Sequence, residues 1–223
     1  MIEIIKKIIS DGDLLPISRA AASISHPGEL IPLIKGLIGE LIDFLKNRED
    51  YTLLDNDILV NNSARVAPSA LIEGPAVIMD GAEIRHCAYL RGSVLVGRQC
   101  TVGNSSEVKN ALLLDGAALP HFNYVGDSVL GPKAHLGAGA IVSNLRSDGA
   151  SVKLTLDGER IDSGLRKLGA VIGASAEIGA GAILNPGTVI GSGARVYPLS
   201  SVRGTVESRS IYKQDGSIVR ILD

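Results

Sequence analysis

Residues 60–96 read VNNSARVAPSALIEGPAVIMDGAEIRHCAYLRGSVLV, and this stretch decides the fold. An aliphatic residue recurs at every sixth position, and the residue four positions further on is usually small. The period continues to Leu114 and returns in two further runs, over residues 130–142 and 172–202. A period of six matches neither the 3.6 residues of an α-helical turn nor the two-residue alternation of a strand. We therefore interpret the chain as short strands separated by turns, coiled so that the aliphatic side chains face a common axis.

This pattern resembles the hexapeptide repeat of the left-handed parallel β-helix over residues 58–207. Glycine follows the aliphatic residue at several positions, including Gly97 and Gly137, where it supplies backbone conformations that other residues resist. Successive coils of such a helix stack at about 4.8 Å, the spacing of paired strands. The resemblance predicts a mainly β fold. It says less about function, because one fold serves several activities.

The segments outside the repeat predict a division into three parts: helical residues 1–55, a β-helix over 56–207, and a hairpin tail over 208–223. Isoleucines at helical spacing predict a short helix over residues 2–10. A broad apolar stripe over residues 30–45 predicts a stronger helix. Both helices need a surface on which to bury these side chains.

We expect that surface to be the first coils or a neighbouring subunit, and a docking surface for another protein is the alternative. At the other end of the chain, the Asp215-Gly216 pair between two apolar runs predicts a β-hairpin. The hairpin would cover the open end of the coil, where unpaired strand edges otherwise invite aggregation.

The composition excludes several classes of protein. The chain has 223 residues, 45% of them hydrophobic and 21% charged, which is not the composition of a disordered chain. Its net charge of −2 provides no basic excess for nucleic acid or an anionic membrane. Cys87 and Cys100 make neither a disulfide framework nor a thiolate metal cluster, so we expect a cytoplasmic protein. We expect no transmembrane helix, because no apolar run approaches 18 residues, and no signal peptide.

Two zones interrupt the repeat, and the candidate catalytic residues lie in them. Residues 120–149 read PHFNYVGDSVLGPKAHLGAGAIVSNLRSDG. This segment resembles the acetyltransferase domain of bifunctional amino-sugar-1-phosphate acetyltransferase/uridylyltransferases, which make the precursor of UDP-N-acetylglucosamine. The excursion VKLTLDGERIDSGLRKLGAVIG, residues 152–173, is similar to the archaeal type of these enzymes. The resemblance covers residues 60–205. It does not include the nucleotidyltransferase domain, so we expect no nucleotidyltransferase activity from this chain.

The resemblance implies acetyl transfer from acetyl-CoA to the amino group of a hexosamine 1-phosphate. His121 matches the catalytic histidine of the family. The acceptor amine must lose a proton, and a neutral imidazole suits that task near pH 7. Asn144 matches the asparagine that contacts the substrate amine. For Asp127, in the same motif, we favour a structural role at a turn over an orienting role.

The resemblance also implies how the two substrates are held. Arg91 and Lys109 match positions that hold the sugar phosphate, where a guanidinium offers forked donors and an ammonium a point charge. Tyr124 matches a hydroxyl that binds the phosphate or the sugar. Lys153 matches a substrate lysine, although the loop that carries it differs in length.

Acetyl-CoA is expected to contact backbone amides near Ala138 and Ala180, and a main-chain donor there could stabilise the developing oxyanion. His135 is a departure, since the family usually has asparagine at this position, which lines the sugar site. Histidine is larger and titratable, so this substitution puts the identity of the sugar in question.

Three alternatives stay open. A carbonic-anhydrase-like zinc site needs three histidines, but glycine (Gly126) occupies the position where the third is expected. A catalytically silent trimeric scaffold or regulatory homologue is the stronger rival. The third alternative is an acetyltransferase for another amino sugar. We adopt the hypothesis that the chain is an acetyltransferase that requires no metal. The family resemblance also implies a homotrimer with its sites in clefts between subunits.

Overall fold

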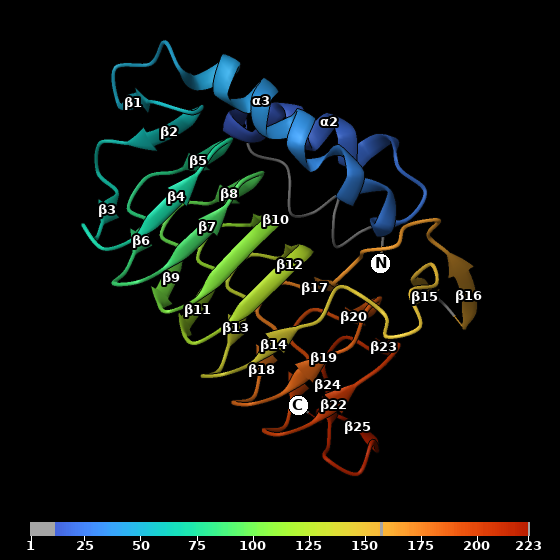
Figure 1. Cartoon of the computed structure of the whole chain (residues 1–223). Helices are drawn as coiled ribbons and strands as arrows, with labels where there is room; N and C mark the ends of the chain where they lie inside the picture. The colour runs from blue at the N-terminus through green and yellow to red at the C-terminus, as the bar shows by residue number, and fades with distance from the viewer. Residues whose placement is uncertain (1–11, 157, 223) are drawn as a thin grey trace.

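The structure is a computed structural model, and it describes residues 12–156 and 158–222. The chain forms the left-handed parallel β-helix that the six-residue period predicts, with three flat faces and turns at the corners (Figure 1). Each coil contributes one short strand to each face, and each strand pairs in parallel with its counterpart in the next coil. The predicted helix over residues 2–10 lies outside the described residues.

We number the faces by the strands that form them. Face 1 contains β2 (Ile58–Asn61), β5 (Ala76–Ile78), β8 (Val94–Val96), the second halves of β10 (Glu107–Leu113) and β12 (Tyr124–Leu130), β17 (Ala170–Ile172), β20 (Thr188–Ile190) and β23 (Thr205–Val206). Face 2 contains β3 (Arg65–Val66), β6 (Glu83–Ile84), β9 (Thr101–Asn104), β11 (Ala118–His121), β13 (His135–Leu136), β18 (Glu177–Ile178), β21 (Arg195–Val196) and β24 (Ser210–Tyr212). Face 3 contains β4 (Leu71–Glu73), β7 (Tyr89–Arg91), the first halves of β10 and β12, β14 (Ile141–Val142), β19 (Ile183–Leu184) and β22 (Ser201–Val202).

The interior is a narrow stack of aliphatic side chains, one from each face in each coil. In one coil these are Ile78, Ile84 and Leu90, none of which is more than 1% exposed. At the N-terminal end of the stack, Val66 is 39% exposed, because the first coil has no coil before it. Three medium-sized side chains fill each layer, which explains why the interior needs no large aromatic ring.

Face 1 is apolar on its outer side as well, and this property determines how the rest of the chain folds. Its outward side chains are buried: Leu59, Val77, Leu95, Leu112, Val129, Val171 and Val189. Helical segments cover the first coils: η1 (Gly12–Leu14), α2 (Leu15–Ser23), η2 (Pro27–Leu33) and α3 (Ile34–Leu45). The expected packing against the first coils is thus what the structure has.

Two features of the helical cover differ from the prediction. The predicted stripe begins as the 3₁₀ helix η2, with Pro32 inside it, and only α3 is a regular α-helix. Proline lacks the N–H that an α-helical turn requires, so the regular helix begins after it. Helix α2 was not predicted, although its sequence LPISRAAAS combines an early proline with a run of alanines.

The excursion between β14 and β17 covers the later coils of face 1. Val129 pairs with Val171 across 42 residues, whereas Ala170 pairs with Thr188 across 18. The extra residues include an antiparallel hairpin of β15 (Lys153–Leu156) and β16 (Glu159–Asp162). Its side chains Val152 and Leu154 are fully buried in the same cluster as the helices. The sequence predicted only an irregular segment here.

Both ends of the coil carry antiparallel strands. At the start, β1 (Tyr51–Leu54) pairs with β2, and at the end, β25 (Ile218–Arg220) pairs with β24. The predicted hairpin around Asp215-Gly216 is therefore confirmed. Because β24 itself pairs with β21, the hairpin continues face 2 beyond the last full coil.

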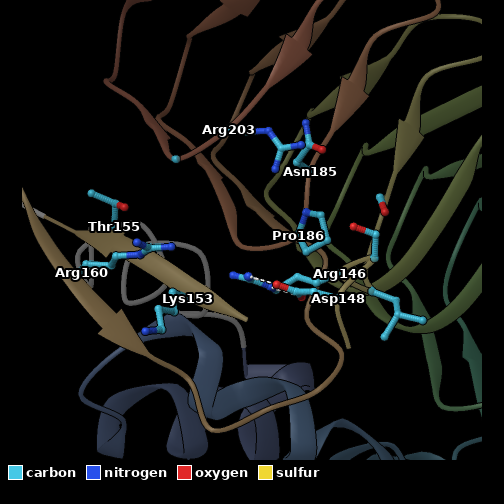
Figure 2. Close-up of a pocket in the computed structure, with 12 residues that line it drawn as sticks. Arg146, Asp148, Lys153, Thr155, Arg160, Asn185, Pro186 and Arg203 are labelled. Carbon is cyan, nitrogen blue, oxygen red and sulfur yellow. Dashed lines mark hydrogen bonds and ion pairs between the residues drawn. The ribbon is translucent and has the colours of Figure 1, made fainter. Parts of the chain in front are cut away.

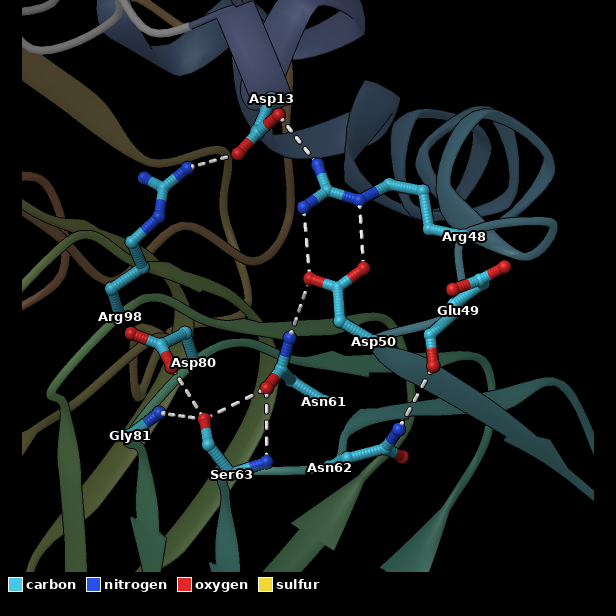
Figure 3. Close-up of polar contacts among 10 residues, drawn as sticks. All are labelled: Asp13, Arg48, Glu49, Asp50, Asn61, Asn62, Ser63, Asp80, Gly81 and Arg98. Atoms are coloured by element: carbon cyan, nitrogen blue, oxygen red, sulfur yellow. Dashed lines mark hydrogen bonds and ion pairs between the residues drawn. The ribbon is translucent and has the colours of Figure 1, made fainter.

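A polar cluster ties the helices to the coil (Figure 3). Arg48, which follows α3, donates two hydrogen bonds to Asp50 at 2.9 and 2.8 Å and one to Asp13 at 2.8 Å. Arg98, on the coil, donates to the other oxygen of Asp13 at 2.6 Å. Each exposed pair contributes little free energy. Together they fix where the helical segment enters and leaves face 1. In the described ranges, no helix is both long and apolar enough to span a bilayer.

The two sides of α3 should contribute differently to stability, because only one of them is covered by face 1. Leu41 is fully buried against face 1, whereas Phe44 on the same helix is 48% exposed. We expect Leu41→Ala to lower the free energy of unfolding by about 2–5 kcal/mol, because it leaves a cavity at the seam. Phe44→Ala should cost less than about 1 kcal/mol. Urea denaturation measures both, and equal losses would contradict this account of the cover.

Candidate active site

Face 3 presents a column of polar side chains, one from each successive coil. Glu73 pairs with Arg91, and Lys109 pairs with Gly126, so these residues stack along one outward column. Arg91 donates from Nη1 to Glu107 Oε1 at 2.7 Å. No hydrogen bond or ion pair engages the Lys109 ammonium within the described residues, and its side chain is half-buried. The structure therefore places the predicted pair, Arg91 and Lys109, on adjacent coils of one face.

Next to this column, Asp127 anchors a buried polar network. The residue is only 5% exposed, and its carboxylate accepts a hydrogen bond from Asn110 Nδ2 at 2.8 Å. Its other oxygen accepts from Asn144 Nδ2. The Asn144 amide also donates to the Tyr124 hydroxyl at 3.3 Å. Asp127 thus holds Asn144, and through it Tyr124, in one orientation.

Gly126 has no side chain in the outward column, and the Tyr124 and Asn144 side chains pack closely against its backbone. A Cβ at this position would lie 2.5 Å from the Tyr124 hydroxyl and 2.6 Å from Asn144 Nδ2. Any side chain at residue 126 would therefore displace them. Glycine therefore allows this close packing, and Lys109 is the register neighbour of Gly126 on the preceding coil. The Tyr124 hydroxyl, the Asn144 amide and the Lys109 ammonium thus lie on one part of face 3.

The Tyr124 hydroxyl stays protonated in this setting. Burial raises the pKa of its phenol, and the carboxylates of Glu107 and Asp127 raise that pKa further. The phenol can therefore donate its proton in a hydrogen bond to an anion across the neutral pH range. Arg91 lowers this pKa, but its effect is smaller than that of burial or of either carboxylate.

His121 lies at the corner between faces 2 and 3, in a second column. The Gly139 N–H donates to the His121 carbonyl, and the Gly181 N–H donates to the Ala138 carbonyl, both at 2.9 Å. His121, Ala138 and the corresponding Ala180 therefore occupy the same corner of successive coils. All three are exposed. In the described part of the chain, the amide N–H groups of Ala138 and Ala180 form no hydrogen bond.

Asn123 fixes the turn that presents His121. It is 3% exposed, and its amide donates to the carbonyls of Gly137 and Ala140 at 2.8 and 3.1 Å. Its own side-chain oxygen accepts the backbone N–H of His121 at 3.1 Å. The buried asparagine leaves the imidazole and the following Phe122 ring outside the coil.

The structure separates two predicted site residues from this group. His135 begins strand β13 on face 2, whereas His121 ends strand β11 on the same face. The Nδ1 atom of His135 is 2.8 Å from Glu177 Oε2. His135 pairs with Ala118, three residues before His121, which corresponds to roughly 10 Å along the strand. Lys153 lies on the β15–β16 hairpin, on a cavity that Ser143 and Leu145 also line, on either side of Asn144. The roles of both residues stay predictions.

Sequence reasoning missed three residues of this arrangement: Asn110, Asn123 and Glu107. The structural role favoured for Asp127 at a turn is incomplete, because its carboxylate binds two side-chain amides and orients Asn144. Asn110 and Asp127 share a signal: both have positive φ, 46° and 48°, a conformation that asparagine and aspartate tolerate. Short polar residues just after an aliphatic repeat position could have indicated this pair.

The described residues contain no group of three or more His, Cys, Asp or Glu side chains that could hold a metal ion. His121 and His135 lie at opposite ends of face 2, and His86 bonds with Ser69 Oγ at 2.6 Å. Gly126 occupies the position at which the carbonic-anhydrase alternative expects its third histidine.

Residues 72–162 match the family model of the GMPPB C-terminal domain. The chain is 35% identical over 178 residues to a bifunctional sugar-1-phosphate nucleotidylyltransferase/acetyltransferase of Sulfurisphaera tokodaii, covering 72% of this chain and 44% of that protein. It is 31% identical over 201 residues to the bifunctional protein GlmU of Methanocaldococcus jannaschii, covering 89% of this chain and 49% of the relative. The chain thus spans about half the length of the curated relatives it matches.

Solved structures resemble the fold more distantly. PerB from Caulobacter crescentus, in complex with CoA and GDP-perosamine, matches 94% of this chain and 76% of its own at 17% identity and a TM-score of 0.37. A putative acetyltransferase of Bacillus cereus matches 72% of this chain and 78% of its own at 16% identity and a TM-score of 0.42.

From the Asp127–Asn144 contact we predict how adding one carboxyl group at residue 144 changes the dependence of stability on pH. Asn144→Asp places a second carboxyl group against Asp127, so one of the two must hold a proton in the folded state. The folded pair then binds a proton that the unfolded chain releases, and stability is present in acid and lost as the pH rises. We expect a loss on the order of 1–3 kcal/mol between about pH 4 and pH 7.

Thermal unfolding across this pH range measures the loss. Asn144→Ala is the matched control, since it removes the same amide but adds no titratable group. Its melting temperature should fall less steeply with rising pH than that of Asn144→Asp, because it loses one hydrogen bond to Asp127 but adds no second carboxyl group. A pH profile of Asn144→Asp that parallels the profile of Asn144→Ala would contradict the assigned contact.

Proposed function

This chain is related over most of its length to bifunctional sugar-1-phosphate nucleotidylyltransferase/acetyltransferases, and we propose that it is an acetyl-CoA-dependent N-acetyltransferase acting on a hexosamine 1-phosphate. Glucosamine 1-phosphate and galactosamine 1-phosphate are the candidate acceptors. The observation that carries the proposal is the grouping of Tyr124 and Asn144 against Gly126, with Lys109 as the register neighbour on the preceding coil. An amino sugar with a phosphate offers groups that suit these donors and acceptors.

In this proposal Lys109 and Arg91 hold the phosphate. Lys109 has its charge available, and Arg91 keeps further donors beyond the one that Glu107 accepts. The two cations and the carboxylates of Glu73 and Glu107 sum to zero on this part of face 3. A phosphate dianion therefore competes with Glu107 for Arg91, and the Tyr124 hydroxyl adds a neutral donor. Lys153 is available to the same phosphate only if the acceptor extends toward the hairpin.

Asn144 positions the acceptor amine. Its amide nitrogen is committed to Asp127 and Tyr124, so its side-chain oxygen is the atom that can accept a hydrogen bond from the amine. Asp127 acts as a positioning residue, because it fixes which way the amide points. A contact of this kind would align the nitrogen lone pair for attack.

His121 takes the proton in the proposed reaction. The amine nitrogen forms a bond to the thioester carbonyl carbon, and the carbon–sulfur bond of acetyl-CoA breaks. The proton lost by the amine passes to His121 and then to the departing thiolate of CoA. The unengaged amides of Ala138 and Ala180 lie in the same column as His121 and are suited to bind the acetyl-CoA arm. No metal ion is needed for these steps.

We further propose that the protein works in the cytoplasm as a homotrimer, with each site completed by a neighbouring subunit. The exposure of His121, Ala138 and Ala180 supports this, because a partner surface is needed to exclude water from the reacting groups. In this proposal His135, whose Nδ1 contacts Glu177, presents its Nε2 to a site shared between two subunits.

The proposal is tested by measuring CoA thiol release from acetyl-CoA with glucosamine 1-phosphate, galactosamine 1-phosphate and unphosphorylated glucosamine. We expect turnover with a phosphorylated acceptor and a KM at least roughly 10-fold higher without the phosphate. His121→Ala should lower kcat by about 10²–10⁴-fold, because the general base is lost. His86→Ala, which removes an exposed imidazole on an earlier coil, is the matched control.

The contradicting outcomes point to the alternatives. No turnover with any of the three acceptors, from a folded trimer, would favour the silent scaffold or an acetyltransferase for another amino sugar. Turnover that is equal in His121→Ala and His86→Ala would remove His121 from the reaction.

A further inference from the structure

A second polar region lies beside the candidate active site, where the β15–β16 hairpin meets the late coils of face 3. It is a cavity of about 760 Å³ (Figure 2). Four cationic side chains line it: Arg146, Lys153, Arg160 and Arg203. Asp148 is the one acidic residue in its lining, so the lining carries a net charge of +3. The whole chain has a net charge of −2, which makes this concentration of positive charge a local feature.

Three of these cations have their charge available. Asp148 binds Arg146, whose Nε lies 2.9 Å from Oδ1, and the contact lowers the pKa of the Asp148 carboxyl. By contrast, no hydrogen bond or ion pair engages the side chains of Lys153, Arg160 or Arg203 in the described part of the chain. Lys153 pairs in register with Asp162, whose oxygens already accept from Ser151 and Gly164.

The cations are held together by a rigid support. Arg203 follows β22, whereas Lys153 and Arg160 lie on the hairpin, so the cavity forms only when the hairpin docks on the coil. Thr205 donates a hydrogen bond to the Thr155 carbonyl, which fixes this docking. A Cβ at Gly187 would come within 2.3 Å of the Lys153 carbonyl, so glycine is needed for the close approach. Like charges that are brought together in this way raise the energy of the empty site.

We propose that this cavity binds the diphosphate group of a nucleotide. Three available cations exceed what one phosphate dianion can neutralise, and two linked phosphates match them better. The volume lies in the range of pockets that hold whole small molecules. Asn185, Thr155 and Ser147 supply neutral polar groups, and Leu145 and Pro186 form an apolar edge for a sugar or base. Since Ser143 and Leu145 flank Asn144, the nucleotide would lie next to the candidate active site.

Calorimetric titration with inorganic pyrophosphate tests the site without any turnover, so its outcome is independent of the proposed reaction. We expect Arg160→Gln and Arg203→Gln each to weaken binding by roughly 10-fold, because each removes a charge-assisted contact. The double variant should bind pyrophosphate about 100-fold more weakly if the two arginines contribute independently. Arg220→Gln is the matched control, since it removes an exposed arginine from the C-terminal hairpin and should bind as the wild type does.

Competition then identifies the source of the diphosphate. CoA and UDP are each titrated against bound pyrophosphate, and the nucleotide that belongs to the site displaces it from the wild type and loses affinity in the double variant. The proposal is wrong if the wild type does not bind pyrophosphate. It is equally wrong if the double variant binds pyrophosphate as well as Arg220→Gln does, or if neither nucleotide competes.

Discussion

The strict stacking of coils is the constraint on which the rest of the molecule depends. Each residue of a coil lies above its counterpart in the next coil, at the spacing of paired strands. Outward side chains therefore form columns, and a column gains a functional feature where one residue departs from its neighbours. Gly126 is such a departure, because its missing side chain lets Tyr124 and Asn144 pack against the backbone in a column that Arg91 and Lys109 otherwise fill.

The same stacking explains why the helices and the hairpin are where they are. The interior of the coil is apolar, and an outer side that meets water must be polar. The outer side of face 1 is apolar instead. That face must be covered, and the chain does so twice, with α2, η2 and α3 over the early coils and the β15–β16 hairpin over the later ones. Covering face 1 brings Lys153 and Arg160 close to the late coils. A requirement of folding thus places charge beside the candidate active site.

The six-residue period was sufficient to predict the coil, because inward packing depends on residue type at fixed positions. The C-terminal hairpin was predicted separately, from its Asp-Gly pair, which is a local turn signal. The period could not predict the excursion, since its hairpin is stabilised by burial against face 1 and by Thr205 from a distant coil. The resemblance indicated Arg91, Lys109, Tyr124 and Asn144, which the structure places on or beside face 3. It could not show that Asp127 binds Asn144, because that contact joins residues of different coils.

The most direct test of the account is a crystal structure with glucosamine 1-phosphate and CoA bound together. The account predicts the phosphate between Arg91 and Lys109, the sugar over Gly126, and the amino group within hydrogen-bond reach of the Asn144 side-chain oxygen. The CoA thiol should lie along the corner column of His121, Ala138 and Ala180. A sugar phosphate bound away from Gly126, with no contact to Tyr124 or Asn144, would contradict it.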